Sequence, residues 1–114
     1  MKVGLDYHDT ISAHPDAFRQ LATALLAAEH EVHIISAVGP NHVKQYTKEI
    51  KRSKVPATAV HMLVYDRHYQ APKLKLEKCI DIGINLFIDD RADTCALLAA
   101  HGILALKVYN FAEV

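Results

Sequence analysis

Two groups of aspartates follow short apolar runs that are typical of buried strands. Asp6 comes after residues 2–5, and Asp89 and Asp90 come after residues 85–88. If these two strands are neighbours, three carboxylates converge, and like charges held that closely repel strongly unless a cation lies among them. Hard oxygen ligands that leave room for water and phosphate suit Mg²⁺. We therefore predict a magnesium site, the alternative being that each aspartate only caps the following turn or helix.

The elements that would position these aspartates alternate along the whole chain. Apolar runs predict strands at 2–5, 32–35, 60–65, 85–88 and 103–108, and helix-period patterns predict helices between them, the third one ending at Gly83. Strands joined by helices favour right-handed crossovers and a mostly parallel sheet that is covered on both faces. We expect one domain over residues 1–114, with a doubly wound, Rossmann-like α/β fold and a five-stranded sheet.

Composition narrows the function classes. The chain has 114 residues, of which 51% are hydrophobic and 23% are charged, and its 13 basic residues balance 13 acidic ones. No overall charge attracts nucleic acid or acidic membranes, so any anion site must be local. No stretch has the length of a membrane helix or the apolar core of a secretory signal, and we expect a cytoplasmic protein without a membrane partner. Cys79 and Cys95 are expected to be free thiols, and the scattered histidines to be surface or partly buried residues without zinc spacing.

Four segments resemble the motifs of one known family. Residues 5–11, Leu-Asp-Tyr-His-Asp-Thr-Ile, look like the first motif of the haloacid dehalogenase superfamily, an apolar strand followed by Asp-x-Asp-x-Thr. Ser36 resembles the second motif, Lys75 is similar in placement to the lysine of the third, and Ile88-Asp89-Asp90-Arg91 resembles the fourth. The four segments occur in the family's order and extend over most of the chain.

The resemblance implies a magnesium-dependent phosphomonoester hydrolase. Asp6 would attack the phosphoryl group and form a transient aspartyl phosphate. Magnesium would be held by Asp6, the backbone carbonyl of His8 and one of the pair Asp89 and Asp90. The phosphate-binding residues would be Ser36, Lys75 and Thr10, with Thr10 bracing the loop. Taken alone, Ser36 could be an ordinary turn hydroxyl and Lys75 an ordinary surface lysine.

His8 departs from the family pattern. It replaces the second aspartate of the first motif, which acts as general acid and base in the family. An imidazole that titrates near neutrality could take the same role, and weak or altered activity is the expected consequence. The alternative is a catalytically degenerate binding or interaction module that keeps magnesium or phosphate binding without turnover.

The spacing of the motifs leaves no room for a cap domain. Only 25 residues separate Thr10 from Ser36, and 38 separate Ser36 from Lys75. Family members without a cap leave the site open, so the expected partner is a phosphorylated small molecule or macromolecule, and a second copy of the chain could lend a lid. A response-regulator receiver domain is a further alternative, although its acidic pair follows the first strand and not the fourth.

Overall fold

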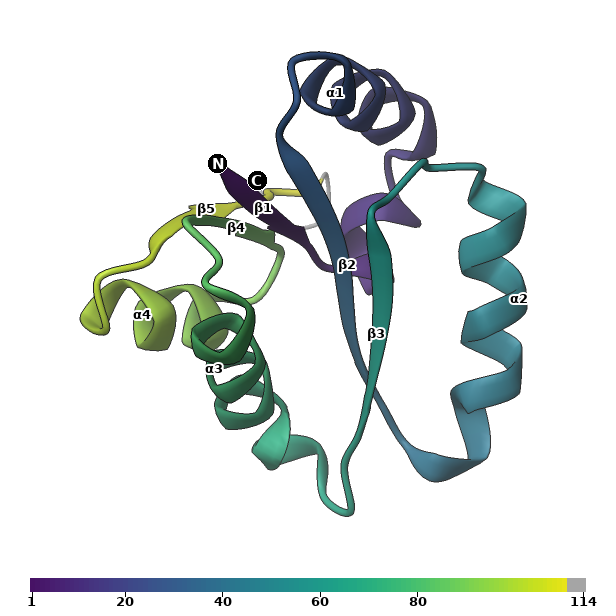
Figure 1. Ribbon diagram of the computed structural model, residues 1–114. Helices are drawn as coiled ribbons and strands as arrows, with labels where there is room; N and C mark the ends of the chain where they lie inside the picture. The colour runs from purple at the N-terminus through teal and green to yellow at the C-terminus, as the bar shows by residue number, and fades with distance from the viewer. Residues whose placement is uncertain (111–114) are drawn as a thin grey trace.

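The computed structural model describes residues 1–110 and contains one sheet. Its strands are β1 (Lys2–Leu5), β2 (Glu31–Val38), β3 (Ala59–Val64), β4 (Leu86–Asp89) and β5 (Leu104–Lys107). All pairings are parallel, and the strand order is β3-β2-β1-β4-β5. The predicted Rossmann-like α/β fold is therefore confirmed (Figure 1). The receiver alternative is excluded, because that fold orders its strands 2-1-3-4-5.

Four α-helices connect these strands. They are α1 (Pro15–Ala27), α2 (Val43–Ser53), α3 (Ala71–Ile82) and α4 (Ala92–Ala100), with short helical turns η1 (Tyr7–Ile11), η2 (Pro40–His42) and η3 (His68–Gln70) before three of them. Pro15 begins α1, where its missing N–H costs nothing. Gly83 ends α3 in the left-handed region at φ 84°, as predicted from its position.

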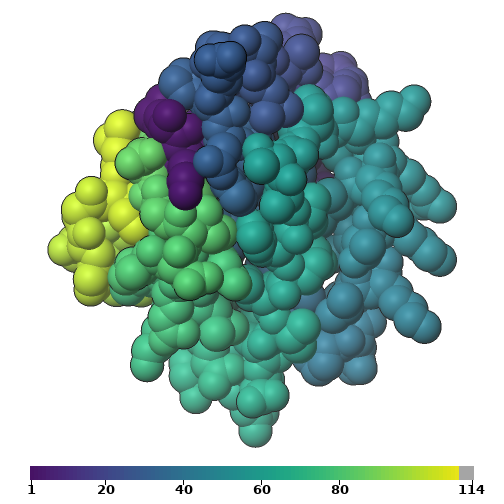
Figure 2. Space-filling model, in the orientation of Figure 1, coloured from purple at the N-terminus to yellow at the C-terminus, as the bar shows by residue number. Residues whose placement is uncertain are grey.

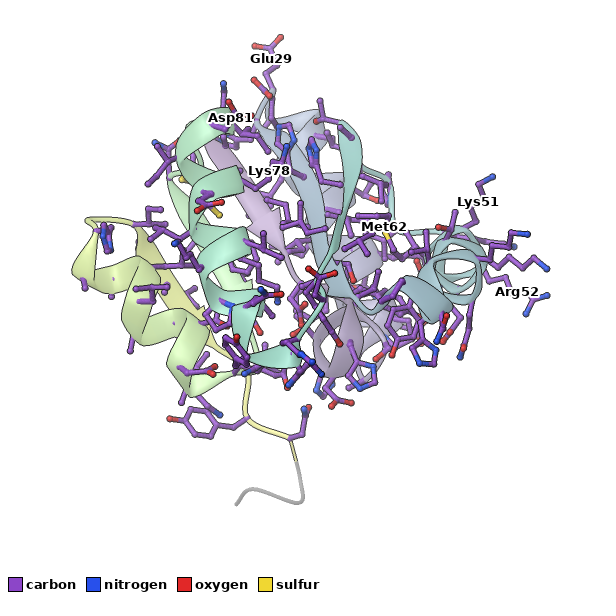
Figure 3. All side chains as sticks on the ribbon, turned by 90° about the horizontal axis from the view of Figure 1, so that it is seen from below. Glu29, Lys51, Arg52, Met62, Lys78 and Asp81 are labelled. Atoms are coloured by element: carbon purple, nitrogen blue, oxygen red, sulfur yellow. The ribbon has the colours of Figure 1, made fainter. Side chains whose placement is uncertain are left out.

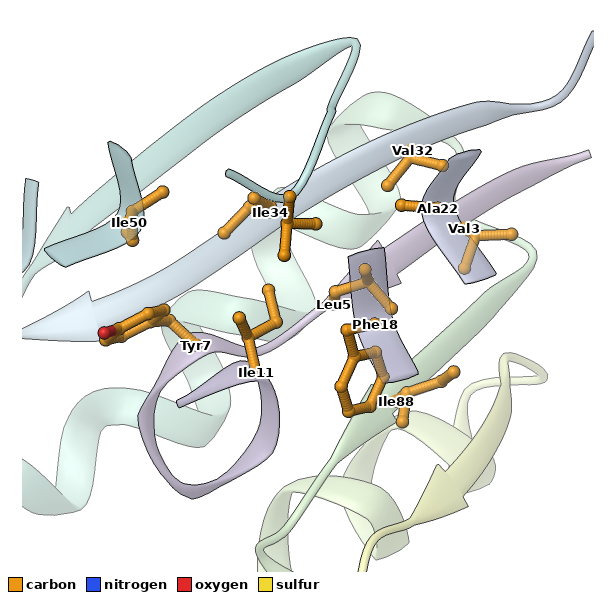
Figure 4. Packing of buried hydrophobic residues seen from close by; sticks show 11 residues of the cluster. Val3, Leu5, Tyr7, Ile11, Phe18, Ala22, Val32, Ile34, Ile50 and Ile88 are labelled. Atoms are coloured by element: carbon orange, nitrogen blue, oxygen red, sulfur yellow. The ribbon is translucent and has the colours of Figure 1, made fainter. Parts of the chain in front are cut away.

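The helices bury both faces of the sheet and so form two cores. One core joins the sheet to α1 and α2 through residues such as Leu5, Phe18 and Ile34 (Figure 4). The other joins it to α3 and α4 through Phe87 and Leu98, among others. Gly4 is needed in the second core, because a Cβ atom there would lie 2.5 Å from the Phe87 ring.

The central strands bring the ends of β1 and β4 together. Leu5 is in register with Ile88, and the backbone N–H of Asp6 donates to the Ile88 carbonyl at 3.0 Å. The aspartates that follow or end these strands therefore meet at one edge of the sheet, as the sequence predicted. Strand β2 runs longer than predicted, to Val38, because residues 36–38 pair with β3. Ser36 consequently lies inside a strand and not directly after its end.

No cap domain interrupts the described chain. Between Thr10 and Ser36 lie only the end of η1, α1 and part of β2, and between Ser36 and Lys75 lie α2, β3, short turns and the start of α3. No helix among residues 1–110 combines the length and the apolar character needed to cross a membrane. Cys79 and Cys95 are free thiols, as expected.

Two histidines pair across β2 and β3, which the sequence analysis did not foresee. His33 Nδ1 lies 3.0 Å from His61 Nε2, and His33 Nε2 lies 2.9 Å from Glu31 Oε1. His33 is buried, whereas a surface or partly buried position was expected. The pKa of His61 lies below its ordinary value of 6.5, because burial and the neighbouring His33 and Lys78 disfavour the protonated ring.

We expect this lowered pKa to make stability depend on pH. Because the unfolded chain binds the proton of His61 more readily, the stability that the neutral His61 contributes is fully present above pH 6.5 and is lost as the pH drops from 6.5 through the lowered pKa. His61→Gln should reduce that fall, whereas His101→Gln, on an exposed helix end, should not. Urea denaturation midpoints measured across this range test the expectation, and equal pH dependence in all three proteins would contradict it.

Candidate metal-binding site

A buried lysine bridges two of the predicted site aspartates. Lys75 Nζ donates to Asp6 Oδ1 at 2.8 Å and to Asp89 Oδ2 at 2.7 Å, and all three residues are almost completely buried. Burial alone would lower the pKa of Lys75, but the charges of the two carboxylates outweigh it and raise this pKa to about 12. Lys75 is therefore a charged group in the floor of the site and not the solvated surface lysine of the alternative interpretation.

Asp90 completes a cluster of three carboxylates. One oxygen from each of Asp6, Asp89 and Asp90 lies within 4.8 Å of the other two. Burial, followed by the proximity of Asp6, raises the pKa of Asp90 to about 7. Burial also raises the pKa of Asp6, with Asp89 adding to the effect and Lys75 opposing it. The single charge of Lys75 does not balance three carboxylates, so the cluster suits an additional cation.

The turn after β1 sets the orientation of Asp6. Thr10 is fully buried and its hydroxyl donates to Asp6 Oδ2 at 3.0 Å. Asp9 adopts a left-handed conformation at φ 59°, which aspartate tolerates better than most residues. The side chain of Asn110 donates to the Asp9 carbonyl at 2.9 Å and holds the turn from outside. Thr10 therefore holds Asp6 through its buried hydroxyl and does not line the cavity, and its expected role in phosphate binding stays a prediction.

A cavity of about 390 Å³ opens above the carboxylates. Of the predicted site residues, Asp6, His8, Lys75 and Asp90 line it, and Ser36, Thr10 and Asp89 lie outside its lining. Ala37, the residue after Ser36, lines the cavity, whereas Ser36 was expected to do so. Asp89 is fully buried, with Oδ1 accepting from the Arg91 backbone N–H at 3.1 Å and Oδ2 from Lys75. Asp90 is therefore the carboxylate of the pair that faces the cavity.

Aromatic side chains form the other wall of this cavity. Its lining includes Tyr65 and His68, together with Tyr46, which the sequence analysis did not assign to the site. His8 is 61% exposed and stacks on Tyr46, with ring centroids 5.8 Å apart and an interplanar angle of 20°. His42 stacks on the same tyrosine at 6.0 Å and 23°. The position of Tyr46 on a helix, at a spacing typical of packing, gave no sign of this role.

Arg91 also lines the cavity and was expected only as part of a motif. Its guanidinium group donates to Asp93 from Nε at 3.0 Å and from Nη2 at 2.6 Å, and Nη1 lies 3.0 Å from His68 Nε2. These contacts with Asp93 and His68 fix the Arg91 guanidinium at the rim of the cavity. The site therefore combines three carboxylates, a buried cation, a rim cation and aromatic rings.

Comparison with known proteins supports the fold. Neither a family model nor a curated protein matches the sequence. Among solved structures, one in a Pnkp1/Rnl/Hen1 complex matches with a TM-score of 0.72 and 11% identity, over 94% of this chain and 45% of that chain, so this chain spans less than half of it. An uncharacterized protein from Corynebacterium glutamicum matches with a TM-score of 0.65 and 12% identity. The match covers 97% of this chain and 86% of that chain. A universal stress protein in complex with cAMP matches with a TM-score of 0.61 and 15% identity, over 96% of each chain.

These findings contradict the predicted haloacid dehalogenase family and the phosphatase function that came with it. No family model matches, and a universal stress protein matches over almost the full length of both chains. The physical reason is that doubly wound sheets gather polar residues at the carboxyl ends of their strands whatever their function, so short motifs there indicate the fold more than the family. The nucleophile role of Asp6 and the acid and base role of His8 rested on the family resemblance alone and stay untested.

Proposed function

We propose that this protein is a binding module that holds a nucleotide through Mg²⁺ at the carboxylate cluster. The observation that carries the proposal is that Asp6, Asp89 and Asp90 offer oxygens within 4.8 Å of one another beside an open, aromatic-lined cavity. Magnesium is commonly bound by one or two carboxylates together with phosphate oxygens and water. The ion would neutralise the cluster and supply positive charge for the phosphate of the ligand.

The residues present fit magnesium in their chemistry and their charge. All three candidate ligands are hard carboxylate oxygens, and burial together with the neighbouring Asp6 and Asp89 raises the pKa of Asp90. Asp90 faces the cavity, so an ion held there is open to a ligand on one side. The backbone carbonyl of His8, predicted as a further ligand, stays a prediction.

The aromatic wall favours a nucleotide over other phosphorylated molecules. Tyr46, Tyr65, His8 and His68 present rings to the same cavity as the carboxylates. Stacking of a base on an aromatic side chain contributes roughly 1–3 kcal/mol, and it does not require a particular base. The cavity volume of about 390 Å³ lies within the range of small-molecule sites. The universal stress protein structure in complex with cAMP is a structural neighbour that holds a nucleotide.

Isothermal titration with ATP, with and without Mg²⁺, tests the proposal. We expect binding to require magnesium and Tyr46→Ala to weaken it by about 5- to 150-fold, the equivalent of one lost stacking contact. Tyr69→Ala is the matched control, because Tyr69 is exposed and lies outside the cavity lining. Equal affinity with and without magnesium, or no binding at all, would contradict the proposal.

Two further expectations stay predictions. One is that the protein is an enzyme. The other is that a second copy of the chain closes the open cavity. Incubation of the Mg²⁺–ATP complex with the protein, followed by chromatography of the nucleotides, would address the first, and sedimentation in the presence of the same ligand would address the second.

A further inference from the structure

Helix α2 carries a row of basic side chains that the nucleotide site does not use. Lys44, Lys48, Lys51 and Arg52 occupy positions i, i+4, i+7 and i+8, which share one face of a helix, and Lys54 follows the helix end. All five are exposed. Figure 3 shows Lys51 and Arg52 pointing away from the rest of the molecule, and Figure 2 shows long side chains projecting from this helix. We call these five residues the α2 basic row.

The positive charge of the α2 basic row is not neutralised by ion pairs among the described residues. Glu49, the acidic residue of α2, turns inward, where Oε1 accepts from the Tyr7 hydroxyl at 3.4 Å and Oε2 is buried. The ion pairs found among residues 1–110 do not include any member of the row. Since the whole chain has no net charge, the row is a local positive surface.

The row begins beside the aromatic wall of the cavity. Tyr46 belongs to the first turns of α2 and lines the cavity, and exposed His42, just before the helix, stacks on it. The rings of His8, Tyr46 and His42 thus lead from the cavity to the N-terminal end of α2. From Lys44 to Lys54 the row then extends roughly 15 Å along the helix, which is long enough to contact several phosphates of one strand.

We propose that the α2 basic row binds the backbone of a single-stranded nucleic acid whose terminal nucleotide occupies the cavity. This proposal rests on the proposed nucleotide site and extends it from a mononucleotide to the end of a strand. A basic groove or row combined with stacking rings is the arrangement that binds single strands without sequence preference. The outer face of α2 has no large exposed apolar side chain among the described residues, which favours nucleic acid over a membrane surface.

Fluorescence anisotropy competition tests this proposal with two probes, thymidine 5′-monophosphate and a 5′-phosphorylated oligothymidylate of about six nucleotides, both with Mg²⁺. We expect the oligonucleotide to bind more tightly than the mononucleotide. Lys48→Gln/Lys51→Gln should weaken oligonucleotide binding roughly 2- to 30-fold and leave mononucleotide binding unchanged. The slope of log affinity against log salt should fall in magnitude by about 1.4, because each phosphate contact with a single strand contributes about 0.7.

The matched control is Lys73→Gln/Lys78→Gln, which removes the same charge from α3 and should alter neither affinity. Oligonucleotide and mononucleotide affinities that are equal in the parent protein would overturn the proposal while leaving the nucleotide site standing. Equal weakening by the α2 and α3 double variants would overturn it as well, because nonspecific charge would then explain the effect. Competition by anionic vesicles of phosphatidylserine at the same row, without any advantage of the oligonucleotide, would assign the row to a membrane instead.

Discussion

Lys75→Met is expected to destabilise the protein by about 3–5 kcal/mol in the absence of divalent metal, the cost of removing one partner from a buried ion pair. Lys75 Nζ lies 2.8 Å from Asp6 Oδ1 and 2.7 Å from Asp89 Oδ2, and its side chain is only 4% exposed. Methionine fills a similar volume but leaves two buried carboxylates without a counter-charge. Urea denaturation of the purified variant in EDTA measures the loss.

Magnesium should restore part of this loss, because the ion can take over the neutralisation of the carboxylates that Lys75 provided. Lys78→Met is the matched control, since Lys78 forms only a 3.8 Å surface pair with Asp81 and its loss should cost less than about 1 kcal/mol. If the Lys75→Met protein proves as stable as the Lys78→Met protein, the ion pairs of Lys75 with Asp6 and Asp89 do not stabilise the fold.

Asp90→Asn should abolish the stabilisation that magnesium confers on the parent protein. An ion that binds only the folded chain adds about 2.7 kcal/mol at a concentration 100 times its dissociation constant. Asp90 is the carboxylate that faces the cavity, and the variant loses its charge while keeping its shape. In EDTA the variant should be at least as stable as the parent, because it removes one of three crowded like charges.

Thermal unfolding across a magnesium series measures both effects, with Asp81→Asn on the exposed face of α3 as the matched control. The control should keep the full response to magnesium. A response of the Asp90→Asn protein equal to that of the parent would place the ion somewhere else on the molecule.

The sheet and the convergence of the aspartates could be predicted from the sequence because both depend on local patterns. Apolar runs separated by helical periods define parallel strands, and parallel strands end at one edge. Because β1 and β4 are neighbours in the sheet, Asp6 and Asp89 lie close together, as expected. Gly83 was predicted to end its helix for an equally local reason, since a left-handed residue is needed there.

The remaining parts of the site depend on contacts between distant segments. Strand β2 continues past Ser36 because β3 offers pairing partners, and the sequence of β2 alone does not reveal where pairing stops. Tyr46 faces the cavity because of how α2 packs beside η1, whereas its spacing predicts only a buried helix face. His33 and His61 pair across two strands, so their separation in sequence concealed the contact.

The family assignment was wrong for a different reason. Its motifs consist of single polar residues at strand ends, which is where any doubly wound protein places the groups of its site. The motifs could not distinguish a binding module from an enzyme. Most of the residues that would bind a metal ion would also be the catalytic residues of a phosphatase.

Binding of a divalent ion at the carboxylate cluster is the central claim, and anomalous diffraction from a crystal soaked in Mn²⁺ tests it most directly. Manganese prefers the same carboxylate, carbonyl and water ligands as magnesium and scatters anomalously. We predict an anomalous peak between the carboxylates of Asp6, Asp89 and Asp90, at the floor of the cavity that Tyr46 lines. A crystal at saturating Mn²⁺ with no peak there, or with a peak only elsewhere, would contradict the account.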